Sequence, residues 1–413
     1  MDNQNDGLWQ GGPWEQPSPA FPNPPAVRLP KAVSRRSVLR PRRRGRRWPW
    51  FLGLFTLIAV ICLSTVLLDR YFRPRLILQD HFPSIGGDGF YHQEDEEEYS
   101  TEPPSIPRAE TGTGVTVPLE PPQGEKLDYI QIYQRALPSA VSIEALTGQG
   151  GSAGSGVVLT QDGYIITNAH VVAGASEVRV IFHNNQRMSA SLVGFDAAED
   201  LAVLKVDAQG LTPARFGDSN TLQVGEPVAA LGDSLGYRAT LTNGIVSSLV
   251  REVEVDGITM ALIQTSAAIN FGNSGGPLLN QYGQVMGINT IKIVTEDGSA
   301  EGLGFAIPSA RIKYVADRLI AGEEVQTGVF GFTVNTVPVE GGGLELIDVE
   351  EDSGAWASGL RPGDILAAAN GAPISGIEDL TLVKLGLGPG DTVSLTYLRN
   401  GERFTVDVAL IAR

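Results

Sequence analysis

The feature that most constrains this chain is a run of 21 residues, from Trp48 to Leu68, that contains no charged side chain. As a helix rising about 1.5 Å per residue it would be roughly 31 Å long, which matches a hydrocarbon core of about 30 Å. Trp48 and Trp50 lie at one end of the run and Tyr71 just past the other, as is typical of aromatic residues at a membrane interface. The run therefore predicts a single transmembrane helix over residues 48–68, with the lipid bilayer as its partner.

The charges beside this run indicate its orientation. Residues 1–50 hold ten Lys or Arg against three Asp or Glu, a net charge of +7, and eight arginines lie between positions 35 and 47. The positive-inside rule places residues 1–47 in the cytoplasm, as a basic, Pro-rich, disordered tail, and the rest of the chain outside it. A cleaved signal peptide is the alternative, but the run is long and no clear small-residue cleavage site follows it. The chain as a whole has a net charge of −16, which argues against a nucleic-acid partner.

Residues 69–126 are acidic and rich in proline. They hold five Lys or Arg against twelve Asp or Glu, a net charge of −7, and 17 of the 26 prolines fall within the first 126 residues. Such a segment buries too little apolar surface to offset the entropy of ordering it. We therefore expect a disordered linker, in which His81 and His92 are solvated.

From about residue 127 the sequence becomes typical of an all-β protein. Short β-rich runs such as VSIEAL, GSGVVLT and LAVLKV alternate with Gly, Asn and Asp turns, a spacing that fits a sandwich or barrel. One helix is expected near residue 310, because Ser309 is a candidate N-cap and Gly322 a candidate stop. A second strand-rich segment follows.

Three side chains in the β-rich region are of the types that a nucleophilic enzyme uses. Ser274 lies among glycines in the string GNSGGPL, where backbone N–H groups could stabilise an oxyanion. His170 ends one apolar run and Asp200 opens another. Each has an ordinary interpretation, as a turn serine, a packed core histidine and a strand-end aspartate. Their order of His, Asp and Ser nevertheless matches the base, orienting acid and nucleophile of chymotrypsin-type double barrels.

The only cysteine, Cys62, lies in the apolar run. An intrachain disulfide framework and a Cys-rich metal site are therefore excluded. We expect neither a metal nor a cofactor. His183, in the string FHNNQ, is interpreted as a turn residue.

Four motifs, in the same order along the chain, resemble those of the HtrA family of trypsin-type serine proteases, the DegP-, DegQ- and DegS-like proteins with an appended PDZ domain. They are TNAHVV (167–172), DLAVLKV (200–206), QTSAAINFGNSGGPLLN (264–280) and GLGFAIP (302–308). The resemblance implies a mainly-β chain. A chymotrypsin-like double β-barrel protease domain would span residues 127–322, followed by a PDZ domain over 327–413.

The resemblance also implies roles for individual residues. His170 would be the general base, Asp200 the acid that orients it, and Ser274 the nucleophile, while the backbone of Gly272, Asn273 and Ser274 would form the oxyanion hole. The substrate pocket would involve Ile269, Asn270, Ile291 and Lys292. Lys292 departs from the small or aliphatic residue that usually lines this pocket in the family. The chain departs from the family pattern at two further positions, with Ser266 where the family usually has Asp and Phe271 where it has Pro.

The C-terminal segment resembles a PDZ module through the string SGLRPGDILAAANGAPI (358–374). A stretch of four residues falls where the family has its carboxylate-binding loop: Val329, Phe330, Gly331 and Phe332. Such loops offer backbone N–H groups to the C-terminal carboxylate of a peptide. C-terminal peptides are therefore the expected PDZ ligands.

Taken with the apolar run, the resemblance implies a membrane-anchored, ATP-independent serine endopeptidase. It would hydrolyse misfolded or regulatory extracytoplasmic proteins and form homotrimers. A PDZ-based chaperone or adaptor with a silent triad is the alternative, and the intact His, Asp and Ser argue against it. A purely structural membrane protein gains no support from any motif.

Overall fold

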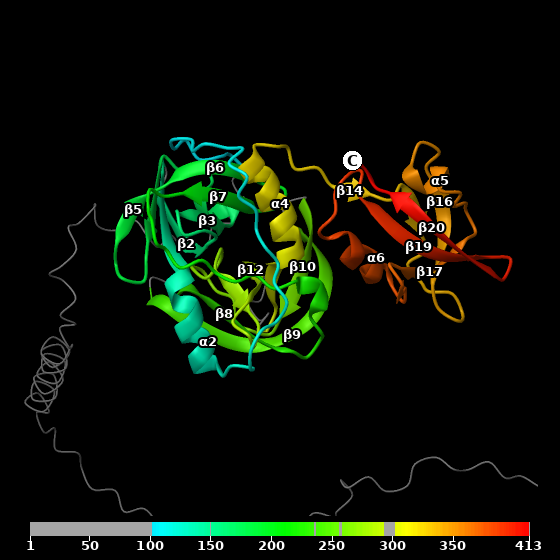
Figure 1. Ribbon diagram of the computed structural model, residues 1–413, viewed down its shortest axis with the longest axis horizontal. Helices are drawn as coiled ribbons and strands as arrows, with labels where there is room; N and C mark the ends of the chain where they lie inside the picture. Colours follow the sequence, from blue (N-terminus) through cyan, green and yellow to red (C-terminus); the bar gives the residue numbers. More distant parts are fainter. Residues whose placement is uncertain (1–100, 149, 235–236, 256–257, 293–301, 413) are drawn as a thin grey trace, which may run out of the picture. The chain divides into compact units, whose positions relative to one another are not determined.

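The computed structural model describes residues 101–148, 150–234, 237–255, 258–292 and 302–412 (Figure 1). The basic tail, the apolar run at 48–68 and most of the acidic segment lie outside these residues. Among the residues that are described, no helix has the length and hydropathy needed to cross a membrane.

The first half of the β-rich region is an antiparallel sheet of seven strands in the spatial order β5-β4-β1-β2-β3-β7-β6. Its strands are β1 (Ala140–Thr147), β2 (Gly150–Val158), β3 (Tyr164–Thr167), β4 (Glu177–Ile181), β5 (Arg187–Ser189), β6 (Ser191–Asp196) and β7 (Leu201–Lys205). Within the described residues its edge strands β5 and β6 do not pair with each other, whereas the sequence analysis predicts a closed barrel. The three-residue strand β5 is largely exposed, which leaves too short an edge to close the sheet.

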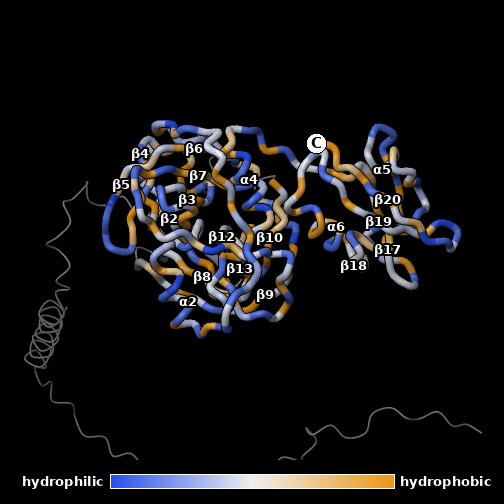
Figure 2. Tube along the Cα trace, in the orientation of Figure 1, coloured by the Kyte–Doolittle hydropathy of each residue, from blue (hydrophilic) through white to orange (hydrophobic). Residues whose placement is uncertain are grey.

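The second half does close into a barrel, in the order β10-β13-β12-β11-β8-β9. Its strands are β8 (Pro227–Ser234), β9 (Tyr237–Val255), β10 (Ile258–Thr265), β11 (Pro277–Leu279), β12 (Val285–Lys292) and β13 (Gly304–Pro308). Figure 2 shows apolar and polar residues interspersed along the chain, and every residue of β11 and β13 is buried. The strands that carry the HtrA-like motifs thus belong to two separate sheets.

Four helical segments accompany these sheets: α2 (Tyr129–Ala136), η1 (Leu137–Ser139), α3 (Ala169–Val172) and η2 (Ser219–Thr221). The predicted helix near residue 310 is α4 (Ser309–Ala321), which ends at Gly322 in a left-handed conformation with φ of 76°. Ser309 is its first residue rather than its N-cap, because its hydroxyl donates to the carbonyl of Gly217, at 2.6 Å. This bond joins the start of α4 to the chain that precedes the second barrel.

Residues 102–127, here called the strap, are packed against both halves, so the expectation of a disordered linker is wrong for residues 102–126. Ile106 is 7% exposed and Val117 is 2% exposed. The strap, cyan in Figure 1, runs beside α4 before the chain enters α2. Its apolar residues are isolated in sequence, but Ile106 packs in one core cluster of the protease region and Val117 packs in another.

Backbone hydrogen bonds hold the strap along its length. The N–H of Gly174 donates to the carbonyl of Glu102 at 2.8 Å, and the N–H of Ser105 donates to the carbonyl of Ala175 at 2.7 Å. Farther along, the N–H of Val117 donates to Asp317 of α4 at 2.7 Å. These hydrogen bonds offset part of the entropy cost of ordering the strap, a cost that its Pro-rich composition suggested would prevent it from folding.

The C-terminal segment forms its own sheet in the order β15-β16-β17-β19-β20, and β14 pairs with β21. The strands are β14 (Gly328–Val329), β15 (Phe332–Val334), β16 (Leu344–Val349), β17 (Ile365–Ala369), β18 (Ala372–Pro373), β19 (Thr392–Arg399), β20 (Glu402–Ala409) and β21 (Ile411–Ala412); the helices are α5 (Gly354–Ala357) and α6 (Ile377–Lys384). A separate apolar cluster that includes Leu346, Leu366 and Leu395 fills it. The segment therefore has a core of its own, as a domain requires.

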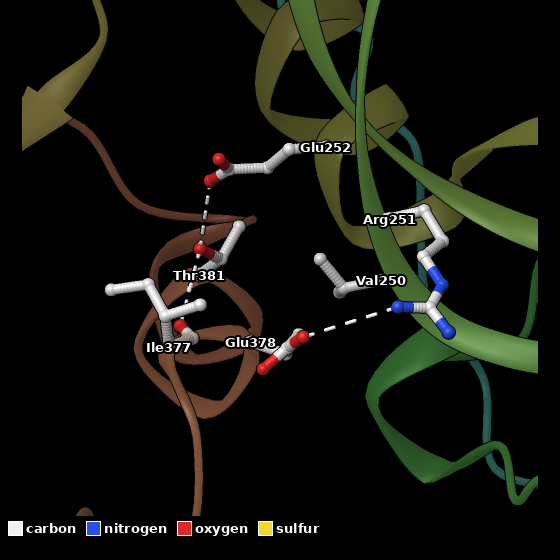
Figure 3. A pocket seen from close by; sticks show the side chains of 6 residues that line it. All are labelled: Val250, Arg251, Glu252, Ile377, Glu378 and Thr381. Carbon is white, nitrogen blue, oxygen red and sulfur yellow. Dashed lines mark hydrogen bonds and ion pairs between the residues drawn. The ribbon is translucent and has the colours of Figure 1, made fainter. Parts of the chain in front are cut away.

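Helix α6 contacts strand β9. Thr381 donates to Glu252 at 3.1 Å, and Arg251 lies 4.0 Å from Glu378 (Figure 3). Both members of the ion pair are more than half exposed, so the pair contributes little stability, on the order of 0–1 kcal/mol. A cavity of about 190 Å³ lies beside these residues and is lined by Val250, Arg251, Glu252, Ile377, Glu378 and Thr381.

The packing of the strap generates a first prediction. Ile106→Ala should lower the free energy of unfolding by about 2–5 kcal/mol, because it removes a buried side chain from a well-packed site. Arg108→Ala, an exposed change two residues away, should stay within about 0.5 kcal/mol of the parent. Denaturant unfolding of both variants measures the difference. Equal stabilities would show that the strap does not belong to the folded core.

Candidate active site

His170 and Asp200 lie side by side although 30 residues separate them in sequence. His170 sits in α3, a single helical turn that directly follows strand β3, and Asp200 closes the turn between β6 and β7. The Nδ1 atom of His170 lies 2.9 Å and 3.0 Å from the two carboxylate oxygens of Asp200, and the backbone N–H of His170 donates to the same carboxylate at 3.1 Å. This arrangement fixes the plane of the imidazole and its Nδ1–H tautomer.

Thr290 completes the surroundings of the Asp200 carboxylate. Its hydroxyl donates to Asp200 Oδ2 at 2.5 Å, and both residues are buried, with Asp200 4% and Thr290 2% exposed. A buried carboxylate is tolerated only where donors surround it. The Thr290 hydroxyl, from strand β12 of the barrel, therefore joins the second half to the acid of the first.

Ser274 lies in the loop that enters β11. Its hydroxyl donates to the carbonyl of Thr290 at 2.9 Å, and its own carbonyl accepts from the N–H of Ser155 at 2.8 Å. A serine hydroxyl has a single proton. Transfer of that proton to a base therefore requires the Ser274 side chain to rotate away from Thr290.

The residues that follow Ser274 must be glycine because neighbouring backbone comes too close. A Cβ atom on Gly275, whose φ is +83°, would lie 2.1 Å from the carbonyl oxygen of Ser155 and 2.4 Å from Thr167 Oγ1. A Cβ atom on Gly276 would lie 2.2 Å from the carbonyl oxygen of Leu231. Since the serine loop is pressed between strands of both halves, its backbone can hold Ser274 in one place.

Asn273 and Ser155 hold the turn before Ser274. The Asn273 side chain accepts from the N–H of Asn270 at 3.0 Å and donates to the carbonyl of Ala268 at 3.2 Å. Ser155 Oγ donates to the carbonyl of Gly272 at 2.7 Å. Within the described part of the chain, the N–H groups of Gly272 and Ser274 have no recorded hydrogen-bond acceptor. Two donors therefore stand beside the nucleophile, as an oxyanion requires.

Comparison with known proteins places this arrangement in a family. A trypsin-like peptidase domain matches residues 154–288 and a PDZ domain matches residues 328–410. The solved structure of the HtrA-type protease AlgW with a tripeptide is 31% identical, with a TM-score of 0.54, and the match covers 69% of this chain and 97% of that one. The chain belongs to the HtrA-type serine proteases. The predicted order of a mainly-β protease domain and a PDZ domain is thereby confirmed.

Two relatives carry the same description, probable periplasmic serine endoprotease DegP-like. The protein from Halomonas elongata is 40% identical over 268 residues, 63% of this chain and 56% of the relative. The protein from Chlamydia trachomatis is 38% identical over 266 residues, 62% of this chain and 53% of the relative. This HtrA-type chain therefore spans about half the length of these relatives.

The residues expected in the substrate pocket differ in their exposure to solvent. Ile269 is 3% exposed and packs in the apolar core of the barrel, whereas Asn270 is exposed in the turn before Gly272. Ile291 and Lys292 end strand β12, and their side chains lie outside the described residues. Phe271, one of the departures from the family pattern, is 82% exposed directly beside Gly272.

Ser266, the other departure from the family pattern, pairs with β9. Its hydroxyl accepts from the N–H of Ile245 at 3.0 Å, and its own N–H donates to the Ile245 carbonyl at 3.1 Å. The serine thus anchors the loop that leads to Ser274.

The four residues expected to bind a carboxylate lie at the start of the PDZ sheet. Val329 ends β14, Gly331 has a φ of +74°, and Phe332 opens β15. The rings of Phe330 and Phe332 stack with centroids 4.9 Å apart. Strand β15 pairs only with β16 among the described strands, which leaves its other edge open to an added strand.

Sequence reasoning missed Thr290 and Ser155. Ser155 directly precedes the apolar end of β2 (GGSAGSGVV), Thr290 lies within β12 (VMGINTIK), and both side chains are buried. A buried hydroxyl in such a run is a signal that it has a specific partner. The sequence could not identify that partner, since the bonds to Asp200 and Gly272 each span at least 90 residues.

The contact between Thr290 and Asp200 gives a second prediction. Thr290→Val keeps the shape of the side chain but removes a hydrogen bond to a carboxylate, typically about 1.5–3 kcal/mol, so turnover of a peptide substrate should fall about tenfold or more. Thr290→Ser, the matched control, keeps the hydroxyl and should stay within about threefold of the parent. If the Val and Ser variants have equal kcat values, the hydroxyl does not support the acid.

Proposed function

We propose that this HtrA-type chain is an ATP-independent serine endopeptidase that hydrolyses peptide bonds in unfolded or regulatory proteins outside the cytoplasm. The observation that supports the proposal is that Thr290 links the two parts of the site: its hydroxyl donates to Asp200, which pairs with His170, and its carbonyl accepts from the Ser274 hydroxyl. The relatives described as periplasmic endoproteases support the location.

The proposed reaction uses this chain's own residues and water. Ser274 Oγ turns from the Thr290 carbonyl, gives its proton to His170 Nε2 and attacks the scissile carbonyl carbon. Asp200 keeps Nδ1–H in place and stabilises the imidazolium as it forms. The N–H groups of Gly272 and Ser274 stabilise the oxyanion, an effect whose loss typically costs about 3–4 kcal/mol.

The second half of the cycle reverses the proton transfer. His170 gives its proton to the leaving amine, and the substrate remains as an acyl ester on Ser274. Water then attacks this ester while His170 again takes a proton, which releases the acid product and restores the serine. Asn273 does not touch the reacting atoms in this scheme but holds the backbone of the oxyanion turn.

For the PDZ domain we propose the binding of C-terminal peptides. The open edge of β15 supports the addition of a peptide strand, and the turn from Val329 to Phe332 supports capture of its carboxylate. The net charge of −16 argues against nucleic acid as a partner.

We further propose a membrane anchor at residues 48–68 and a homotrimeric assembly. The anchor is supported by the uncharged run and by the arginines that precede it. The trimer is supported only by membership of the family. Light scattering of the purified protein would measure its mass directly.

The central test is hydrolysis of an unfolded protein such as casein. Ser274→Ala should lower turnover by about a million-fold, since the nucleophile acts as a unit with its base. Thermal unfolding of the variant should match the parent, which separates lost chemistry from lost folding. Equal rates for the parent and the variant would instead favour a PDZ-based chaperone or adaptor.

The anchor has a separate test. A version that begins at residue 101 should remain in the supernatant when membranes are sedimented, because the apolar run has been removed, while the full chain should sediment with them. If the shortened protein still partitions into membranes, another segment holds it there.

A further inference from the structure

The turn that carries Asp200 is held in an unusual conformation. Asp200 has a φ of +49°, in the left-handed region that costs a non-glycine residue on the order of 1–2 kcal/mol. Inside the turn, the N–H of Asp200 donates to the carbonyl of Ala197 at 3.3 Å, and the N–H of Glu199 donates to Asp196 at 2.9 Å. Surrounding groups must therefore keep Asp200 in this conformation.

The residue before Asp200 is clamped by an arginine from outside the turn. Glu199 accepts hydrogen bonds from two nitrogens of Arg311, Nε at 2.8 Å and Nη2 at a short distance. The side chains of this pair are 17% and 10% exposed, so water screens them little. A bidentate pair between a guanidinium and a carboxylate fixes direction as well as distance.

Arg311 is fixed on its own side. It lies in the first turn of α4, whose Ser309 hydroxyl donates to Gly217 and accepts from the N–H of Ser219 at 2.9 Å. Its guanidinium also lies 4.7 Å from the ring centre of Tyr314. The arginine therefore holds the turn from a rigid base.

The pair of Glu199 and Arg311 also brings a positive charge to a turn that is rich in carboxyl groups. Asp196, Glu199 and Asp200 place three carboxyl groups on one short turn. Burial raises the pKa of Asp196 above its usual value, against the hydrogen bond from the Glu199 N–H, and the charge of Glu199 raises it further. Burial alone would lower the pKa of Arg311, but the hydrogen bond and charge of Glu199 hold it above its usual value. The positive charge of the Arg311 guanidinium thus offsets the negative charge of the carboxyl groups on this turn.

We propose that Glu199 and Arg311 are positioning residues for the catalytic acid. By holding the turn from outside, the pair keeps the Asp200 carboxylate aligned with His170 Nδ1. We assign neither residue a contact with substrate. Glu199 acts through the backbone that it shares with Asp200, and Arg311 acts by holding Glu199. The inference rests on the proposed peptidase function and assigns this pair a part in it.

The test compares variants of the pair in the full chain. Glu199→Ala and Arg311→Met should each lower kcat for a peptide substrate by about 10- to 100-fold, with KM changed less than about twofold, because a small displacement of a catalytic group costs that much. The double variant should lose no more than either single one, since both remove the same contact. Arg311→Lys, which keeps the charge but not the bidentate geometry, should be intermediate.

A variant on the same helix serves as the matched control. Lys313→Met removes the pair between Lys313 and Asp317, which does not reach the turn, and should leave kcat unchanged. The downfield proton resonance of His170 Nδ1–H reports the bond to Asp200 directly. It should shift or broaden in Glu199→Ala and stay as in the parent in Lys313→Met, whatever the stability of the variants.

Two outcomes would overturn the inference. One is a Glu199→Ala protein with kcat within about threefold of the parent and an unchanged resonance. The other is additive losses in the double variant, which would mean that the two residues act separately. An inactive parent would instead contradict the proposed function, while the resonance would still report on the positioning of Asp200.

Discussion

The carboxylate of Asp200 is the group on which the arrangement of the site depends. It is almost fully buried and accepts hydrogen bonds from the ring and backbone of His170 and from the hydroxyl of Thr290. A buried anion that lost these donors would cost several kcal/mol. The donors come from a helix of the first half and a strand of the second. The two halves must therefore pack together before the Asp200 carboxylate has all of these hydrogen bonds. Folding and assembly of the site are in this sense the same event.

The serine loop depends on the same docking. Gly275 lies against Ser155 of the first sheet, and Gly276 lies against Leu231 of the barrel. Ser155 donates to the carbonyl of Gly272, while the N–H groups of Gly272 and Ser274 have no hydrogen-bond acceptor among the residues that the structure describes. Donors held in place in this way need no reorganisation when the oxyanion forms, and such preorganisation is a large part of catalysis by this kind of site.

The sequence predicted the catalytic residues of this site better than it predicted the residues that hold them in position. His170, Asp200 and Ser274 stand out because each lies in a string that resembles a family motif, and α4 was expected from its Gly322 stop. Thr290, Ser155 and the pair of Glu199 with Arg311 were not singled out, since their meaning lies in contacts across 90 or more residues. Local pattern carries no information about such pairings.

The strap was misjudged for a related reason. Its composition predicts disorder, yet Ile106 and Val117 each fill a gap in a core built by other segments, and its backbone bonds to Ala175 and Asp317. Average composition cannot detect isolated residues that complete a distant surface.

The central claim is that the Ser274 hydroxyl is activated toward electrophiles. Labelling with a sulfonyl fluoride, followed by mass spectrometry of the digested protein, tests it most directly. We expect modification at Ser274, near one equivalent per chain, in the folded protein. The same serine should not be modified when the protein is unfolded. A folded protein whose Ser274 stays unmodified, or reacts no faster than its other serines, would contradict the account.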